Sequence, residues 1–198
     1  MSKESKVENG DAQSISPKKL SHAVFRTCHF KEMVEWYKTV LNAEIMNQNE
    51  FIAFMTYDDE HHRIAIATMP GMIERPKHSA GIDHLSFTYE SLGDLVATYE
   101  RLKALGITPH VSVNHGLTTS FYYRDPDGNG VELQIDNLDP SEWKDWMRHG
   151  MSKENPFGTT IDPEDITRKY HAGVPESEIK STKITGTFDF ETLRRLSE

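Results

Sequence analysis

The chain has 198 residues, enough for one domain with a sizeable core and an extension. Hydrophobic residues make up 36% of it and aromatic residues 10%, which is typical of a globular protein. A formal net charge of −9 argues against a nucleic-acid backbone or an anionic membrane as partner. Cys28 is the only cysteine, so no internal disulfide forms, and no apolar run reaches membrane-spanning length. We therefore expect a cytoplasmic protein with no nucleic-acid and no membrane partner.

The first part of the chain is predicted to be a strand, a helix and three further strands. An apolar stripe with helical spacing indicates the helix over residues 30–41. Alternating apolar residues between polar turns indicate the strands. The strands are expected over residues 20–27, 44–48, 51–57 and 63–68. A turn-rich linker over residues 70–80 then ends this unit.

The same order of elements follows a second time. A helix is expected between its cap at Ser91 and the stop at Gly106. Strands are expected over residues 82–89, 108–113, 119–124 and 130–135. The first strands of the two units, S-H-A-V-F-R-T and D-H-L-S-F-T-Y, carry a histidine at the same place, His22 and His84. The two units therefore form an internal repeat.

Two such units predict an α+β fold: two paired βαβββ modules that form one curved mixed sheet with the helices outside. This domain is expected over residues 18–137, with modules over residues 18–69 and 81–137. The remaining segments are a disordered N-terminal arm over residues 1–17 and a helical and irregular C-terminal extension over residues 138–198. We expect residues 140–170 of this extension to pack over the mouth of the concave face, in the same chain or in a partner subunit, and to influence substrate choice.

Three side chains of the concave face have the chemistry of metal ligands. Alternation along the last strand turns Val131 and Leu133 toward the helix, which leaves Glu132 on the concave face. A single histidine in a strand is more often an ordinary polar residue, but His22 and His84 share a repeat position and face an otherwise costly carboxylate. Two histidines and one carboxylate are typical of a metal site that keeps positions open.

Residues 113–132 add a more specific pattern. Together with the paired units they resemble the vicinal oxygen chelate superfamily, known for its glyoxalase, bleomycin-resistance and dioxygenase members. Within it they resemble the ring-cleavage signature of one-domain type I extradiol dioxygenases. The residues that meet this signature are His115, Phe121, Tyr122, Asp125, Pro126, Gly128 and Glu132.

The resemblance implies an Fe(II) site made by His22, His84 and Glu132. It also implies that His115 is the acid/base residue and Tyr122 a hydrogen-bond donor beside it. The expected reaction inserts both atoms of O₂ into a small catechol-type aromatic diol and opens its ring. The short members of this family further imply a homodimer or higher homo-oligomer.

Two alternative functions stay open. A metal-dependent transferase or isomerase has the same fold. Thiol-transferase members also use two histidines and one glutamate, and the ring-cleavage signature argues against them. Glyoxalase-like members take a fourth ligand from the last strand of the first unit. In this chain that position falls near Ile64 or Ala65, which are not ligands. A metal-free protein that binds an aromatic ligand is disfavoured because burying Glu132 beside two histidines without a metal is costly. A further histidine expected on the oxygen side has only His78 as a weak candidate.

Overall fold

The computed structural model describes residues 15–76, 79–150, 153–181 and 183–186, and within them it contains the two expected βαβββ units. The first unit consists of β1 (Ala23–Arg26), α1 (Phe30–Leu41), β2 (Glu44–Gln48), β3 (Ile52–Thr56) and β4 (Ile64–Ala67). The second consists of β5 (His84–Thr88), α2 (Leu92–Ala104), β6 (Val111–Asn114), β7 (Thr118–Arg124) and β8 (Gly130–Asp136). The predicted order of elements is confirmed.

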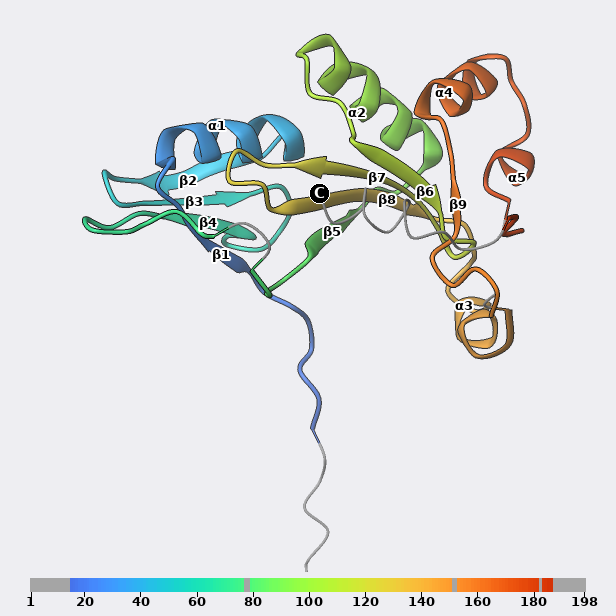
Figure 1. Cartoon of the computed structure of the whole chain (residues 1–198), viewed down its shortest axis with the longest axis horizontal. Helices are drawn as coiled ribbons and strands as arrows, with labels where there is room; N and C mark the ends of the chain where they lie inside the picture. The colour runs from blue at the N-terminus through green and yellow to red at the C-terminus, as the bar shows by residue number, and fades with distance from the viewer. Residues whose placement is uncertain (1–14, 77–78, 151–152, 182, 187–198) are drawn as a thin grey trace, which may run out of the picture.

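Hydrogen bonding divides the strands between two sheets, where the sequence suggested one continuous sheet. The first sheet has the order β1-β4-β3-β2, and the second has the order β5-β8-β7-β6-β9, in which β9 (Thr159–Thr160) comes from the C-terminal extension. In each unit the first strand pairs in parallel with the last. Helices α1 and α2 lie on the same side of the two sheets (Figure 1). The opposite side is called the inner face below.

The two helices bury the apolar stripes seen in the sequence. Met33, Tyr37 and Val40 of α1 are fully buried, and α1 ends at Asn42, which has the left-handed conformation common after helices. Helix α2 begins at Ser91, whose side chain accepts a hydrogen bond from the backbone N–H of Asp94. The helix caps and stripes therefore follow local sequence rules.

The strands of the second unit alternate as predicted. Val131 and Leu133 of β8 and Phe121 of β7 are buried in the main core with the helices. Tyr122 belongs instead to a small separate cluster with Val111 and Val113 of β6. Because successive strand residues point to opposite faces, Tyr122 and Glu132 both lie on the inner face.

The C-terminal extension adds short elements beside the second unit: α3 (Trp143–Asp145), the π-helical turn η1 (Trp146–Gly150), β9, α4 (Pro163–His171) and α5 (Glu176–Ile179). Helix α4 packs against the outside of α2, where Glu164 contacts Tyr99 and Lys103. The expectation that all of residues 140–170 cover the inner face is therefore wrong for α4. Its residues Ile166 and Thr167 are buried, and Ile166 belongs to the main hydrophobic core together with residues of α2.

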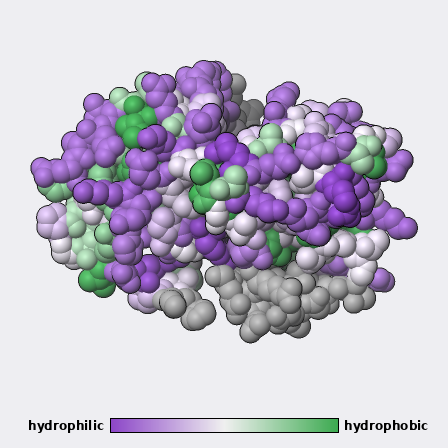
Figure 2. Space-filling view, turned by 90° about the horizontal axis from the view of Figure 1, so that it is seen from above, coloured by the Kyte–Doolittle hydropathy of each residue, from purple (hydrophilic) through white to green (hydrophobic). Residues whose placement is uncertain are grey.

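Two surface properties follow from this arrangement. Viewed from the side on which the helices lie, the molecule is mostly hydrophilic, with small scattered hydrophobic spots (Figure 2). Within the described ranges, every helix is too short or too polar to cross a membrane.

Candidate active site

Glu132 lies at the centre of a polar group on the inner face. On strand β8 it pairs with Ser86 of β5 on one side and with Tyr122 of β7 on the other. Only 4% of Glu132 is exposed. A buried carboxylate needs several partners to offset its loss of hydration, so its neighbours define the site.

Contacts from three elements converge on this carboxylate. His84 Nε2 lies 3.1 Å from Glu132 Oε2, and the Tyr122 hydroxyl donates to Oε1 over 2.9 Å. His115 Nε2 lies 2.8 Å from the same Tyr122 hydroxyl. These contacts connect His84, Glu132, Tyr122 and His115 in one continuous chain, in which the single hydroxyl proton of Tyr122 can go to Glu132 Oε1 or to His115 Nε2. These are four of the five site residues predicted from the sequence.

The charges of this chain follow from its hydrogen bonds. Burial raises the pKa of Glu132, but hydrogen bonds from His84, Ser120, Ser86 and Tyr122 outweigh burial and lower the pKa to about 2. The hydrogen bond with Glu132 is the main cause that raises the pKa of His84 to about 9, against the effect of desolvation. Near neutral pH the two side chains form an ion pair, and His84 must release its proton before Nε2 can bind a metal.

The pKa of His115 is shifted in the opposite direction to that of His84. Burial lowers its pKa, so the ring is mainly neutral at pH 7. It sits in the tight connection between β6 and β7, where its backbone N–H donates to the carbonyl of Thr118. Gly116 supplies the left-handed conformation of this turn, with a φ of 80°. A neutral, half-buried imidazole in a tight turn is suited to accept a proton.

His22 lies apart from these four residues. Its exposed ring stacks on His62 with 4.3 Å between the ring centroids, and His61 lies close by. Over the residues that the structure describes, no three His, Cys, Asp or Glu side chains are grouped so that they could hold a metal ion. The structure therefore brings two of the three predicted ligands together and leaves His22 on the first sheet.

The repeat nevertheless gives His22 and His84 matching backbone positions. The residue after each histidine pairs in parallel with the last strand of its unit: Ala23 pairs with Ile64, and Leu85 pairs with Val131. One step further, Val24 pairs with Ala65 as Ser86 pairs with Glu132. The first-unit equivalent of Glu132 is therefore Ala65. A methyl group stands where a fourth protein ligand would be.

Sequence reasoning missed three contributors to the site. Ser86 and Ser120 hydrogen bond to Glu132. The backbone of Phe157, in the C-terminal extension, hydrogen bonds to His115. Strand alternation signals the two serines, because each is two residues from a site residue, whereas nothing local signals Phe157. His78 lies outside the described residues.

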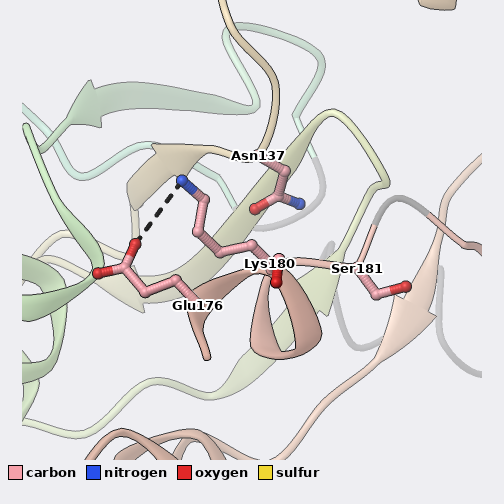
Figure 3. A pocket seen from close by; sticks show the side chains of 5 residues that line it. Asn137, Glu176, Lys180 and Ser181 are labelled. Carbon is pink, nitrogen blue, oxygen red and sulfur yellow. Dashed lines mark ion pairs between the residues drawn. The ribbon is translucent and has the colours of Figure 1, made fainter. Parts of the chain in front are cut away.

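A separate cavity of about 400 Å³ lies between the end of β8 and α5. It is lined by Asn137, Glu176, Ser177, Lys180 and Ser181. Lys180 Nζ and Glu176 Oε2, from the same helical turn, lie 4.0 Å apart in its lining (Figure 3). None of these five residues belongs to the polar group around Glu132, so we do not regard the cavity as the active site.

Comparison with known proteins identifies the family. The profile of the Glyoxalase/Bleomycin resistance protein/Dioxygenase superfamily matches residues 19–133, more than half of the chain. The chain belongs to this superfamily. The match covers the first βαβββ unit, the second unit as far as the middle of β8, and every residue of the polar group except Phe157. The predicted family is confirmed.

Two members of the superfamily from Rhodococcus globerulus are similar over most of the chain. Biphenyl-2,3-diol 1,2-dioxygenase 2 is 44% identical over 163 residues, which is 81% of this chain and 86% of the relative. Biphenyl-2,3-diol 1,2-dioxygenase 3 is 43% identical over 169 residues, which is 84% of this chain and 88% of the relative. Both alignments are longer than the superfamily match, so the similarity extends into the flanking segments.

A solved structure of the superfamily supports the fold alone. The glyoxylase/bleomycin resistance protein/dioxygenase domain from Frankia sp. EAN1pec has a TM-score of 0.50 and 21% sequence identity. It covers 61% of this chain, and the chain covers 99% of that domain.

Proposed function

We propose that this protein is an iron(II)-dependent extradiol dioxygenase that opens the ring of a catechol-type aromatic diol and incorporates both atoms of O₂. The extradiol dioxygenase activity predicted from the sequence is confirmed by relatives of 44% and 43% identity that align over most of both chains. The observation that carries the assignment to this site is the chain of contacts from His84 through Glu132 and Tyr122 to His115.

The donor set fits iron(II). His84 and Glu132 already direct a nitrogen and an oxygen to one place, 3.1 Å apart. Imidazole and carboxylate ligands with open positions are typical of non-haem iron oxygenases. We infer that His22 completes the set by turning away from His62, because its ring is exposed and its backbone position matches that of His84. A bound iron(II) would supply a centre at which the diol and O₂ could bind side by side and exchange electrons.

The residues beside the ligands then have distinct tasks. Neutral His115 accepts a proton from a diol hydroxyl through Nε2, the nitrogen that faces Tyr122. The hydroxyl of Tyr122 donates a hydrogen bond to a substrate oxygen as negative charge develops on it. Tyr122 is buried and His115 is half-buried, and the partial exclusion of water strengthens these interactions.

Ala65 separates this proposal from a glyoxalase-type isomerase. A fourth protein ligand at this position would fill a coordination site that O₂ or the diol needs. The side chain of Ala65 is a methyl group that binds no metal, and the residue is fully buried. The site therefore keeps the open positions that an oxygenase requires.

We also propose the domain organisation expected from the sequence. The arm covers residues 1–17, the catalytic domain residues 18–137 and the extension residues 138–198. The superfamily match over residues 19–133 supports the boundaries of the catalytic domain. A homodimer or higher homo-oligomer stays a prediction.

Anaerobic reconstitution with iron(II) tests the function. After addition of a panel of catechols and O₂, we expect oxygen uptake and the yellow colour of a ring-opened product. His22→Ala, His84→Ala and Glu132→Ala should each lower bound iron, whereas His115→Gln should keep iron and lose turnover. His149→Ala is the control, because its side chain is 72% exposed at η1. Absence of oxygen uptake with every diol would reject the proposal, and normal iron in His22→Ala would remove His22 from the ligand set.

A further inference from the structure

His115 has a hydrogen-bond partner from beyond the region that the superfamily profile matches. Its ring hydrogen bonds to the backbone of Phe157, and the profile match ends at residue 133. Since Nε2 faces the Tyr122 hydroxyl, Nδ1 is the nitrogen left for the Phe157 carbonyl. We propose that residues 155–160 form a brace that orients His115 and keeps its proton on Nδ1. This inference rests on the proposed acid/base role of His115.

Strand pairing places the brace beside His115. Strand β9 pairs with β6, so that Thr160 lies opposite Val113 and Thr159 opposite Asn114, the residue before His115. The backbone N–H of Ile161 donates to the carbonyl of Ser112, which continues the contact. The brace is thus an added edge strand of the sheet that carries His115, and its position is fixed by backbone hydrogen bonds.

A side-chain clamp shapes the brace. Buried Asn155 donates from Nδ2 to the carbonyl of Gly158 over 2.7 Å, and its Oδ1 accepts from the N–H of Gly158 over 3.1 Å. The backbone N–H of Thr185 donates a hydrogen bond to the hydroxyl of Thr159 over 2.8 Å. These bonds hold the turn that presents the carbonyl of Phe157.

Gly158 allows the close approach. Its φ is +97°, a conformation that favours glycine, and a Cβ there would lie 2.3 Å from the carbonyl oxygen of Asn114 and 2.9 Å from Cα of His115. Neither contact can be relieved by a flexible side chain, because both atoms belong to the backbone. A substitution at Gly158 must therefore move the brace away from His115.

The brace has a chemical consequence for the site. A neutral imidazole carries one proton, so a proton held on Nδ1 by the Phe157 carbonyl leaves a lone pair on Nε2. Nε2 is the atom that faces Tyr122 and the inner face. Without the brace the proton distributes between the two nitrogens, and part of the population presents an N–H where a base is needed.

NMR of the histidine ring tests this directly in the full chain without iron. The sample is labelled with ¹⁵N at histidine and held at pH 8, and long-range ¹H–¹⁵N correlation distinguishes the two tautomers. His115 is assigned by the signals missing in His115→Gln. We expect the wild-type ring to carry its proton on Nδ1. A proton predominantly on Nε2 would overturn the proposal, and this measurement needs no variant of the brace.

Gly158→Ala provides the perturbation, and Gly173→Ala is the matched control. Gly173 also has a positive φ of +74° in the extension, but a Cβ there meets nothing within 4 Å. Gly158→Ala should give a mixed tautomer signal and, in iron-loaded enzyme of normal iron content, a kcat lower by about 10- to 100-fold. The KM for the diol should change less. Gly173→Ala should match the wild type in tautomer and kcat.

The outcomes distinguish failure of the brace from failure of the proposed acid/base role of His115. If His115→Gln keeps full turnover, the proposed role of His115 fails. If His115→Gln loses turnover while Gly158→Ala keeps the wild-type tautomer and kcat, the brace fails and the function stands. If Gly158→Ala does not fold by circular dichroism, Asn155→Ala replaces it, because that change removes the clamp without adding a Cβ to the contact with Asn114.

Discussion

At the scale of the residue, Tyr122 links the ligand side of the site to the acid/base side. Its hydroxyl has one proton and two acceptors within reach, Glu132 Oε1 at 2.9 Å and His115 Nε2 at 2.8 Å. Burial is the main cause that raises the pKa of Tyr122, and the charge of Glu132 adds to it, so the hydroxyl stays protonated. Tyr122 therefore keeps its proton at neutral and moderately alkaline pH.

Replacing Tyr122 with phenylalanine tests this role. Tyr122→Phe removes the hydroxyl and keeps the ring that packs on Val111 and Val113. Loss of one oriented donor should lower kcat by about 10²-fold. Bound iron should stay near the wild-type level, because Tyr122 is not a proposed ligand. Steady-state oxygen uptake and metal analysis measure the two quantities.

Tyr123→Phe is the matched control, since its hydroxyl lies on the other face of the same strand. An equal loss of kcat in both variants, or a loss of iron in Tyr122→Phe, would contradict the role given to Tyr122.

At the scale of the element, the D-P-D-G turn between β7 and β8 is held by hydrogen bonds inside the turn and by one hydrogen bond from the first unit. Asp125 Oδ1 accepts hydrogen bonds from the backbone N–H groups of Asp127 and Asn129. Its Oδ2 accepts from the hydroxyl of Tyr37 on α1 over 3.1 Å. Asp125 and Tyr37 are both buried. The turn therefore sets the start of β8, and with it the position of Glu132.

Tyr37→Phe tests how much the helix contributes to this turn. The change leaves the buried carboxylate of Asp125 with one donor fewer, which should lower the free energy of unfolding by about 1–2 kcal/mol. Urea unfolding followed by circular dichroism measures the loss. Tyr57→Phe serves as the control, because Tyr57 is 44% exposed and should change stability little. Equal stability of Tyr37→Phe and the wild type would show that the remaining donors suffice.

At the scale of the whole molecule, polar contacts join the two βαβββ units. His29, just before α1, lies with Nδ1 2.7 Å from Oδ1 of Asp127 in the second unit. Arg101 of α2 donates to the carbonyl oxygens of Thr39 and Val40 at the end of α1. The second unit thus contacts the first at both ends of α1. These contacts hold the first sheet, which His22 immediately precedes in the chain, beside the second sheet, which contains His84.

The His29–Asp127 pair predicts a pH dependence of stability. The hydrogen bond with Asp127 raises the pKa of His29 above 6.5, with burial opposing it. Folding thus gains stability that is fully present below the unfolded pKa and is lost as the pH rises through the raised folded pKa. The difference in urea midpoint between wild type and Asp127→Asn should be largest near pH 6 and shrink toward pH 9.

Asp59→Asn is the control for that measurement. It removes the same charge from an exposed carboxylate and should give a difference that does not follow the His29 titration. A wild-type advantage over Asp127→Asn that stays constant from pH 6 to pH 9 would rule out the ion pair.

Much of the fold and of the site could be predicted because it follows from periodic patterns. Helical stripes at α1 and α2 and alternation along β7 and β8 depend on neighbours close in sequence. The repeat then placed His22 and His84 at matching strand positions, and the spacing from His115 to Glu132 indicated the chemistry. Four of the five predicted site residues are in contact in the structure.

What the sequence alone determined is therefore the order of the elements, the face on which each strand residue lies, and the residue types of the site. Only the tertiary structure decided that the strands separate into two sheets, that Ala65 occupies the position equivalent to Glu132, and that His22 stacks on His62. It also decided that α4 packs against α2 and that the backbone of Phe157 hydrogen bonds to His115. The physical reason is that strand register and docking depend on contacts between distant segments, for which local periodicity carries no signal.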